Sequence, residues 1–88
     1  MCSYLTLQLE IDGSAKAPGG RWQAVRQATV YFDHPVHAMA EHTLNLDLTG
    51  TPSDPSARIA LELTAASARE LVAAINRALD SAPAEMTV

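Results

Sequence analysis

The stretch ARIALELTAASARELVAAINRALDSA, residues 57–82, decides the fold because its hydrophobic period changes once along its length. Apolar residues first alternate with polar ones, which predicts a strand over 57–63 with one buried face. After Thr64 they recur at intervals of three and four, which predicts an amphipathic helix. Thr64 suits the N-cap because its hydroxyl can accept an N–H of the first turn, and Pro83 cannot continue the helix. The apolar stripe of this helix consists of Ala68, Leu71, Val72, Ile75, Ala78 and Leu79.

Three segments upstream alternate in the same way and predict three more strands. They cover residues 4–11, 24–33 and 42–49, and we expect a loop over residues 12–20, where Gly, Ala and Pro accumulate. The predicted fold class is therefore α+β: a four-stranded antiparallel β-meander with one C-terminal helix packed on one face. The opposite sheet face is mostly polar and is expected to face water. We expect a single domain over 1–82 and a flexible tail over 83–88.

Composition excludes several classes of protein. The chain has 88 residues, of which 48% are hydrophobic and 18% charged, and its net charge is −4. Regular apolar spacing with so few charges excludes a disordered chain. The acidic balance lacks the basic stripe of a nucleic-acid binder, and no apolar run is long enough to span a membrane. We therefore expect neither a nucleic-acid partner nor a membrane partner.

The single cysteine and the opening residues bear on location. One cysteine cannot form an internal disulfide, which favours a reducing compartment. The opening MCSYLTLQLE alternates and has no basic segment ahead of an apolar run, so we expect no signal peptide and a cytoplasmic protein. A chain this short has a thin core and two sheet edges, so we also expect a homo-oligomer, most simply a dimer. The sequence does not identify the surface through which the copies would associate.

All three histidines lie within nine residues, at His34, His37 and His42. Imidazole is a common ligand of transition metals, and a strand end followed by a loop can bring three such rings together. Neighbouring carboxylates can add a ligand or orient an imidazole, and sulfur favours copper or zinc. The leading hypothesis is a zinc, copper, nickel or iron site that supports chemistry on a small molecule, built from His34, His37, His42, Asp33, Glu41 and Cys2.

Other interpretations of these residues stay open. A histidine-rich loop often contacts only water, and Cys2 is equally well explained as a small buried hydrophobic side chain. A metal-free protein–protein interaction module would use the polar sheet face, where Asp47 and Glu62 also hint at facing carboxylates. A small-molecule enzyme would use His37 or His42 as a general base. The sequence does not decide whether the chain is an enzyme, or whether Met1 is removed to expose Cys2.

Four stretches carry a resemblance to other proteins. They are Tyr31-Phe32-Asp33-His34-Pro35-Val36-His37, Glu41-His42-Thr43-Leu44-Asn45, the opening Met1-Cys2, and the helix start Ala68-Arg69-Glu70-Leu71. Together they resemble a family of short bacterial proteins of unknown function, and the resemblance covers nearly the whole chain. It implies no activity, because that family has no settled one.

Overall fold

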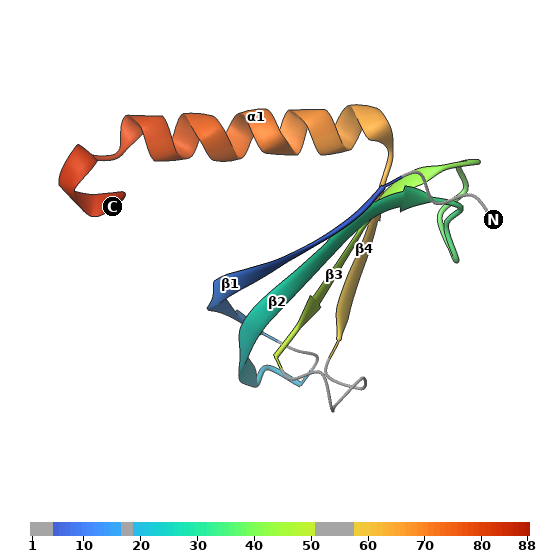
Figure 1. Ribbon diagram of the computed structural model, residues 1–88, viewed down its shortest axis with the longest axis horizontal. Helices are drawn as coiled ribbons and strands as arrows, with labels where there is room; N and C mark the ends of the chain where they lie inside the picture. The colour runs from blue at the N-terminus through green and yellow to red at the C-terminus, as the bar shows by residue number, and fades with distance from the viewer. Residues whose placement is uncertain (1–4, 17–18, 51–57) are drawn as a thin grey trace.

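The computed structural model describes residues 5–16, 19–50 and 58–88. The described elements are β1 (Thr6–Lys16), β2 (Trp22–Asp33), β3 (Thr43–Thr49), β4 (Ile59–Leu63), the helix α1 (Ala65–Ser81) and the short 3-10 helix η2 (Ala84–Met86). The strands form one antiparallel sheet in the order β1-β2-β3-β4, and α1 contacts β3 and β4 (Figure 1). The predicted α+β meander with a C-terminal helix is therefore confirmed.

The first hairpin is longer than the sequence pattern predicts. The β1–β2 register shifts between Glu10 and Gly13, and pairing then resumes as far as Lys16 opposite Trp22. The predicted loop over 12–20 is therefore wrong for its first part, because the Asp-Gly pair marks a β-bulge instead of the end of a strand. Gly19 and Gly20 have positive φ angles, which glycine adopts without steric cost, and they return the chain to β2.

The register separates an apolar face of the sheet from a polar one. On the apolar face Val30 lies opposite Leu46, which in turn lies opposite Leu61. On the polar face Tyr31, Asn45 and Glu62 form a second row across the same three strands. Helix α1 lies on the apolar side, as the alternation of the strands predicts.

Helix α1 begins and ends with hydrogen-bonded caps. The N–H of Ser67 donates to Thr64 Oγ1 at 3.2 Å, as predicted for an N-cap, and the N–H of Ala82 donates to the carbonyl of Leu79 at 3.2 Å. The helix diverges from the sheet, and its C-terminal turns extend past the strands (Figure 1). None of its residues, all of which the structure describes, is buried. No helix in the described part of the chain is long and apolar enough to cross a membrane.

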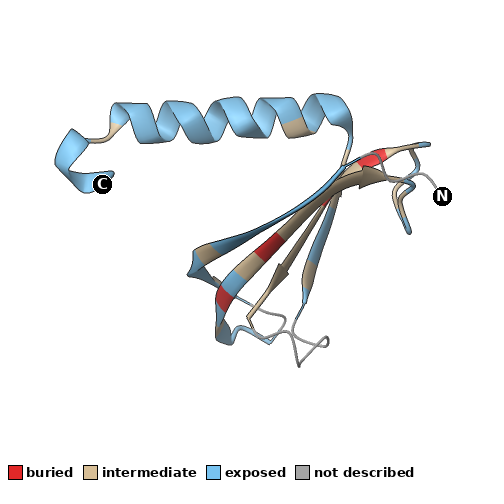
Figure 2. Ribbon diagram, in the orientation of Figure 1, coloured by how far each residue is buried: buried red, intermediate tan, exposed pale blue. Residues whose placement is uncertain are grey.

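Burial is concentrated in the sheet (Figure 2). Among the described residues, four are buried: Val25, Ala28, Thr43 and Asn45. The last two belong to the polar face, so the expectation that this face simply meets water is wrong for its centre. Leu61, on the apolar face, is 41% exposed. The polar face is thus better covered than the apolar one.

Candidate functional site

Glu62 on β4 anchors the loop over residues 34–42 to the polar face of the sheet. Its carboxylate accepts the backbone N–H groups of Ala38 at 2.7 Å and His37 at 3.0 Å, and also that of Val36. These hydrogen bonds, the one from Ala38 foremost, lower the pKa of the Glu62 carboxyl, since they stabilise its charged form. The loop therefore has a defined position over the polar face, although its residues are mostly exposed.

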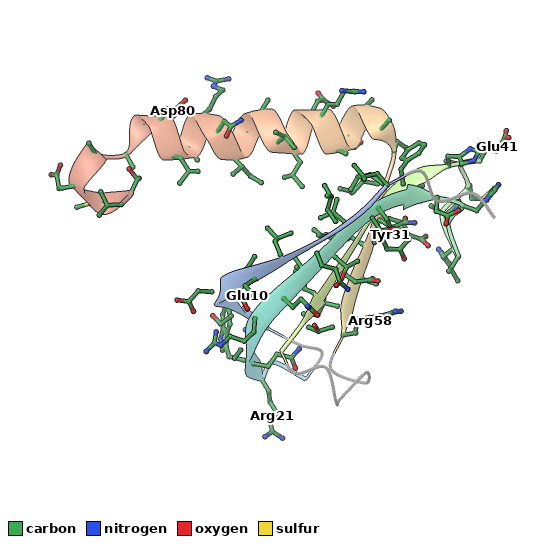
Figure 3. The ribbon with its side chains drawn as sticks, in the orientation of Figure 1. Glu10, Arg21, Tyr31, Glu41, Arg58 and Asp80 are labelled. Carbon is green, nitrogen blue, oxygen red and sulfur yellow. The ribbon has the colours of Figure 1, made fainter. Side chains whose placement is uncertain are left out.

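The anchored loop and strands β2, β3 and β4 enclose a hollow of about 510 Å³. This volume lies within the range of small-molecule sites. Figure 3 shows Tyr31 and Arg58 pointing away from the side of the sheet that faces the helix. The polar side chains that line the hollow are Tyr31, His34, His37, Asn45, Asp47, Arg58 and Glu62.

Tyr31, Asp47 and Arg58 are electrostatically linked at the floor of this hollow. The Asp47 carboxylate is near enough to the Tyr31 phenol to influence its pKa, and a guanidinium nitrogen of Arg58 lies 3.8 Å from Asp47 Oδ2. Burial, followed by the negative charge of Asp47, raises the pKa of the Tyr31 phenol. Tyr31 is therefore a neutral hydroxyl at physiological pH, and the Asp47 charge is paired with a guanidinium.

Two of the three histidines predicted as metal ligands, His34 and His42, have their rings in contact. The ring centroids of His34 and His42 are 4.4 Å apart, and His42 also stacks on Phe32 at 5.7 Å. Asp33 Oδ1 lies 3.4 Å from His34 Nδ1 and accepts the backbone N–H of His34 at 2.7 Å. The pair is thus packed against an aromatic ring on one side and has a carboxylate beside it.

The other predicted metal ligands lie elsewhere. His37 lines the hollow beside Glu62, and Glu41 is exposed at the far end of the loop (Figure 3). Cys2 lies outside the described residues. The part of the chain that the structure describes contains no group of three or more His, Cys, Asp or Glu that could hold a metal ion. The metal site predicted from the sequence thus stays a prediction.

Sequence reasoning missed several residues of the hollow. The strand alternation places three of them, Tyr31, Asn45 and Arg58, on the polar face without predicting a hollow. It also does not predict that Glu62 anchors the loop over residues 34–42. The suggested carboxylate pair is offset, because Glu62 pairs with Asn45 and Asp47 pairs with Ala60. The only available signal was the strand alternation, which places these side chains on one face without showing that a loop covers them.

The chain belongs to a family that has no assigned function. Residues 1–88 match the model of a family described as "Family of unknown function (DUF6295)". Neither a curated protein nor a solved structure matches the chain. The family resemblance of the short motifs is thereby confirmed over the whole sequence, and it assigns no activity. A function for this chain must therefore be inferred from the arrangement of its side chains.

Proposed function

We propose that this member of a family without an assigned function is a binding domain for a small molecule rich in hydrogen-bond acceptors, such as one bearing a carboxylate or phosphate group. The observation that carries the proposal is the anchoring of the loop over 34–42 by Glu62 across a polar hollow. Loops held in place over a concave site by a rigid sheet are common positions for ligands.

The balance of donors and acceptors in the hollow suggests the class of ligand. Its two carboxylates already have partners: Glu62 accepts three backbone N–H groups, and Asp47 forms an ion pair with Arg58. Arg58 has five N–H donors, and its ion pair with Asp47 at 3.8 Å engages them only weakly. The N–H donors of Arg58 that Asp47 leaves weakly engaged favour a ligand that accepts hydrogen bonds.

The imidazole of His37 adds to this argument. It lines the same hollow and sits on backbone that Glu62 fixes. A general base at His37, as hypothesised from the sequence, would therefore act on a ligand bound in this hollow. His42 is packed against Phe32 and His34 and is not among the residues that line the hollow, so His37 is the better candidate of the two for that role.

Titration with inorganic phosphate and with acetate, followed by amide and side-chain NMR shifts, tests the proposal. We expect saturable shifts at His37 and Arg58, and we expect Arg58→Gln to abolish them. Arg26→Gln is the matched control, because Arg26 pairs with Asp12 at 3.2 Å near the β1 bulge, outside the hollow. If neither anion produces saturable shifts up to about 10 mM, the proposed ligand class is wrong.

The contact between His34 and His42 favours a second candidate function, transition-metal binding. The two rings bring two nitrogen donors close together, and among the described residues no third His, Cys, Asp or Glu groups with them, so this candidate rests on the ring contact alone. Zn²⁺ titration monitored by the melting temperature tests it: stabilisation that His42→Ala removes supports the metal site. An unchanged melting temperature at about 1 mM Zn²⁺, which corresponds to binding weaker than about −4 kcal/mol, contradicts it.

A further inference from the structure

The space between α1 and the sheet is an open apolar groove of about 800 Å³. Its walls are side chains of β2, β3, β4 and the first half of α1, all of them apolar except Arg69. Beyond the groove the same surface continues along the edge strand β1, where Leu7 and Leu9 are about half exposed, and to Leu5 just before it, which is 63% exposed. Exposed apolar patches of this extent on a soluble chain usually mark an interface.

Helix α1 also leaves its apolar side chains partly exposed. Leu71, Val72, Ile75 and Leu79 form its apolar stripe and are 43%, 58%, 50% and 52% exposed. An isolated helix of this length is only marginally stable in water, and burial of its stripe normally supplies the missing free energy. The contacts of α1 with β3 and β4 leave about half of that stripe exposed, and Leu79 is not among the residues that line the groove.

The total exposed area shows how much more surface this chain exposes than a compact monomer of its size. The chain exposes 6876 Å², whereas a compact monomer of 9.4 kDa exposes about 5,000 Å². Its radius of gyration is 14.6 Å, against about 12 Å for a compact domain of 88 residues. This excess of about 1,900 Å² per chain, summed over all residues, is larger than the roughly 800 Å² that each partner of a standard interface buries, so an interface of standard size fits within it.

We propose that a second copy of this chain occupies the groove, in a two-fold homodimer that joins the apolar concave faces formed by α1 and the sheet. An isologous interface needs a surface that complements itself, and this face presents apolar side chains on both of its walls. The charged residues of α1 are two arginines, Arg69 and Arg77, and two acids, Glu70 and Asp80, so a second identical helix brings no net repulsion. The polar hollow lies on the other side of the sheet and stays open in this dimer.

Gel filtration with light scattering on the full chain, with two variants, tests the dimer. The wild type should have a mass of twice 9.4 kDa. Leu79→Glu places a charge on the stripe beyond the groove, at a side chain that is 52% exposed within one chain, and should abolish the dimer. Ala73→Glu adds the same charge away from the stripe and should leave the dimer intact. A monomeric wild type at about 100 µM, or a Leu79→Glu variant as dimeric as Ala73→Glu, overturns the proposal.

A loss of folding in Leu79→Glu would not hide the answer, because a dimer that folds on association has a melting temperature that depends on protein concentration. The wild-type melting temperature should rise when the concentration is raised a hundredfold, and a constant value contradicts the dimer. Native mass spectrometry distinguishes a second copy of the chain from any other occupant of the groove. A single chain carrying an apolar small molecule, or a single chain alone, overturns the second copy as the occupant of the groove.

Discussion

Thr43 is the most completely buried side chain among the described residues, at 0% exposure, and it lies on the polar face. Its Oγ1 donates to Asn45 Oδ1 at 2.6 Å, so the two buried polar groups satisfy each other. Thr43→Val keeps the shape but leaves the Asn45 oxygen without this donor. We expect the free energy of unfolding to fall by about 1–3 kcal/mol, measured by urea denaturation at a fixed protein concentration.

Thr29→Val is the matched control for that change. Thr29 lies on the same face, opposite Asp47, but it is only half-buried. This control should shift the urea midpoint much less than Thr43→Val does. Equal midpoints for the two variants would show that the bond between Thr43 and Asn45 contributes nothing specific.

Glu62 couples the position of the loop over 34–42 to pH. Its pKa is lowered in the folded protein, chiefly by the N–H of Ala38, so the stabilisation from the charged carboxylate is complete above the ordinary value of 4.5. It is lost as the pH falls from that value through the lowered pKa. Hydrogen exchange should therefore show the amides of Val36, His37 and Ala38 losing protection on acidification below pH 4.5, after correction for intrinsic exchange rates.

Glu62→Gln should produce the same loss of protection at neutral pH, because the amide side chain has a single, uncharged acceptor oxygen. Glu10→Gln serves as the control, since Glu10 is exposed on β1. Protection that survives in Glu62→Gln would mean that the loop is held by other contacts. In that case the argument for a pre-formed hollow would lose its basis.

At the scale of elements, Gly50, the residue that follows β3, lies close to the backbone of β2. A Cβ at this position would lie 2.5 Å from the carbonyl oxygen of Ala24, which is backbone and cannot move aside cheaply. Gly50→Ala should destabilise the protein by about 1–3 kcal/mol. Gly13→Ala is a matched control, because a Cβ there meets nothing within 4 Å. Similar melting temperatures for the two variants would contradict the close approach.

The elements themselves follow largely from hydrophobic period. Alternation locates the four strands, and the change of period after Thr64 locates the helix to within one residue of its end at Ser81. The β1 bulge at Gly13 was not predicted, because an Asp-Gly pair looks the same at a bulge and at a strand end. Local patterns indicate where these elements lie along the chain, whereas their stability depends on packing against one another.

The candidate site was less predictable because it depends on contacts between distant residues. Glu62 reaches backbone that lies 24 to 26 residues earlier in the chain, and no local pattern encodes that contact. The spacing of the histidines suggested that three rings converge, yet the loop path brings His34 to His42 and leaves His37 beside Glu62. The sequence singled out the loop that lines the hollow but not the arrangement of its side chains.

At the scale of the whole molecule, the two faces of the sheet have different roles. The polar face is covered by its own loop and contains the hollow, whereas the apolar face and α1 remain half open. The thin core and two sheet edges of a short chain predict association, and the exposed apolar face is the surface that we propose for it. The two proposals, binding of an acceptor-rich ligand and formation of a dimer, therefore concern opposite sides of the sheet, and each can be tested without disturbing the other.

The most direct measurement of the central claim, a second copy on the apolar face, is an isotope-filtered NOE experiment. Labelled and unlabelled chains are unfolded together, refolded as a mixture and compared with unmixed samples. The account predicts intermolecular NOEs from the methyl groups of Ile75 and Leu79 of one copy to apolar side chains on the concave face of the other. NOEs confined to single chains, or intermolecular NOEs that involve only the polar face, would contradict it.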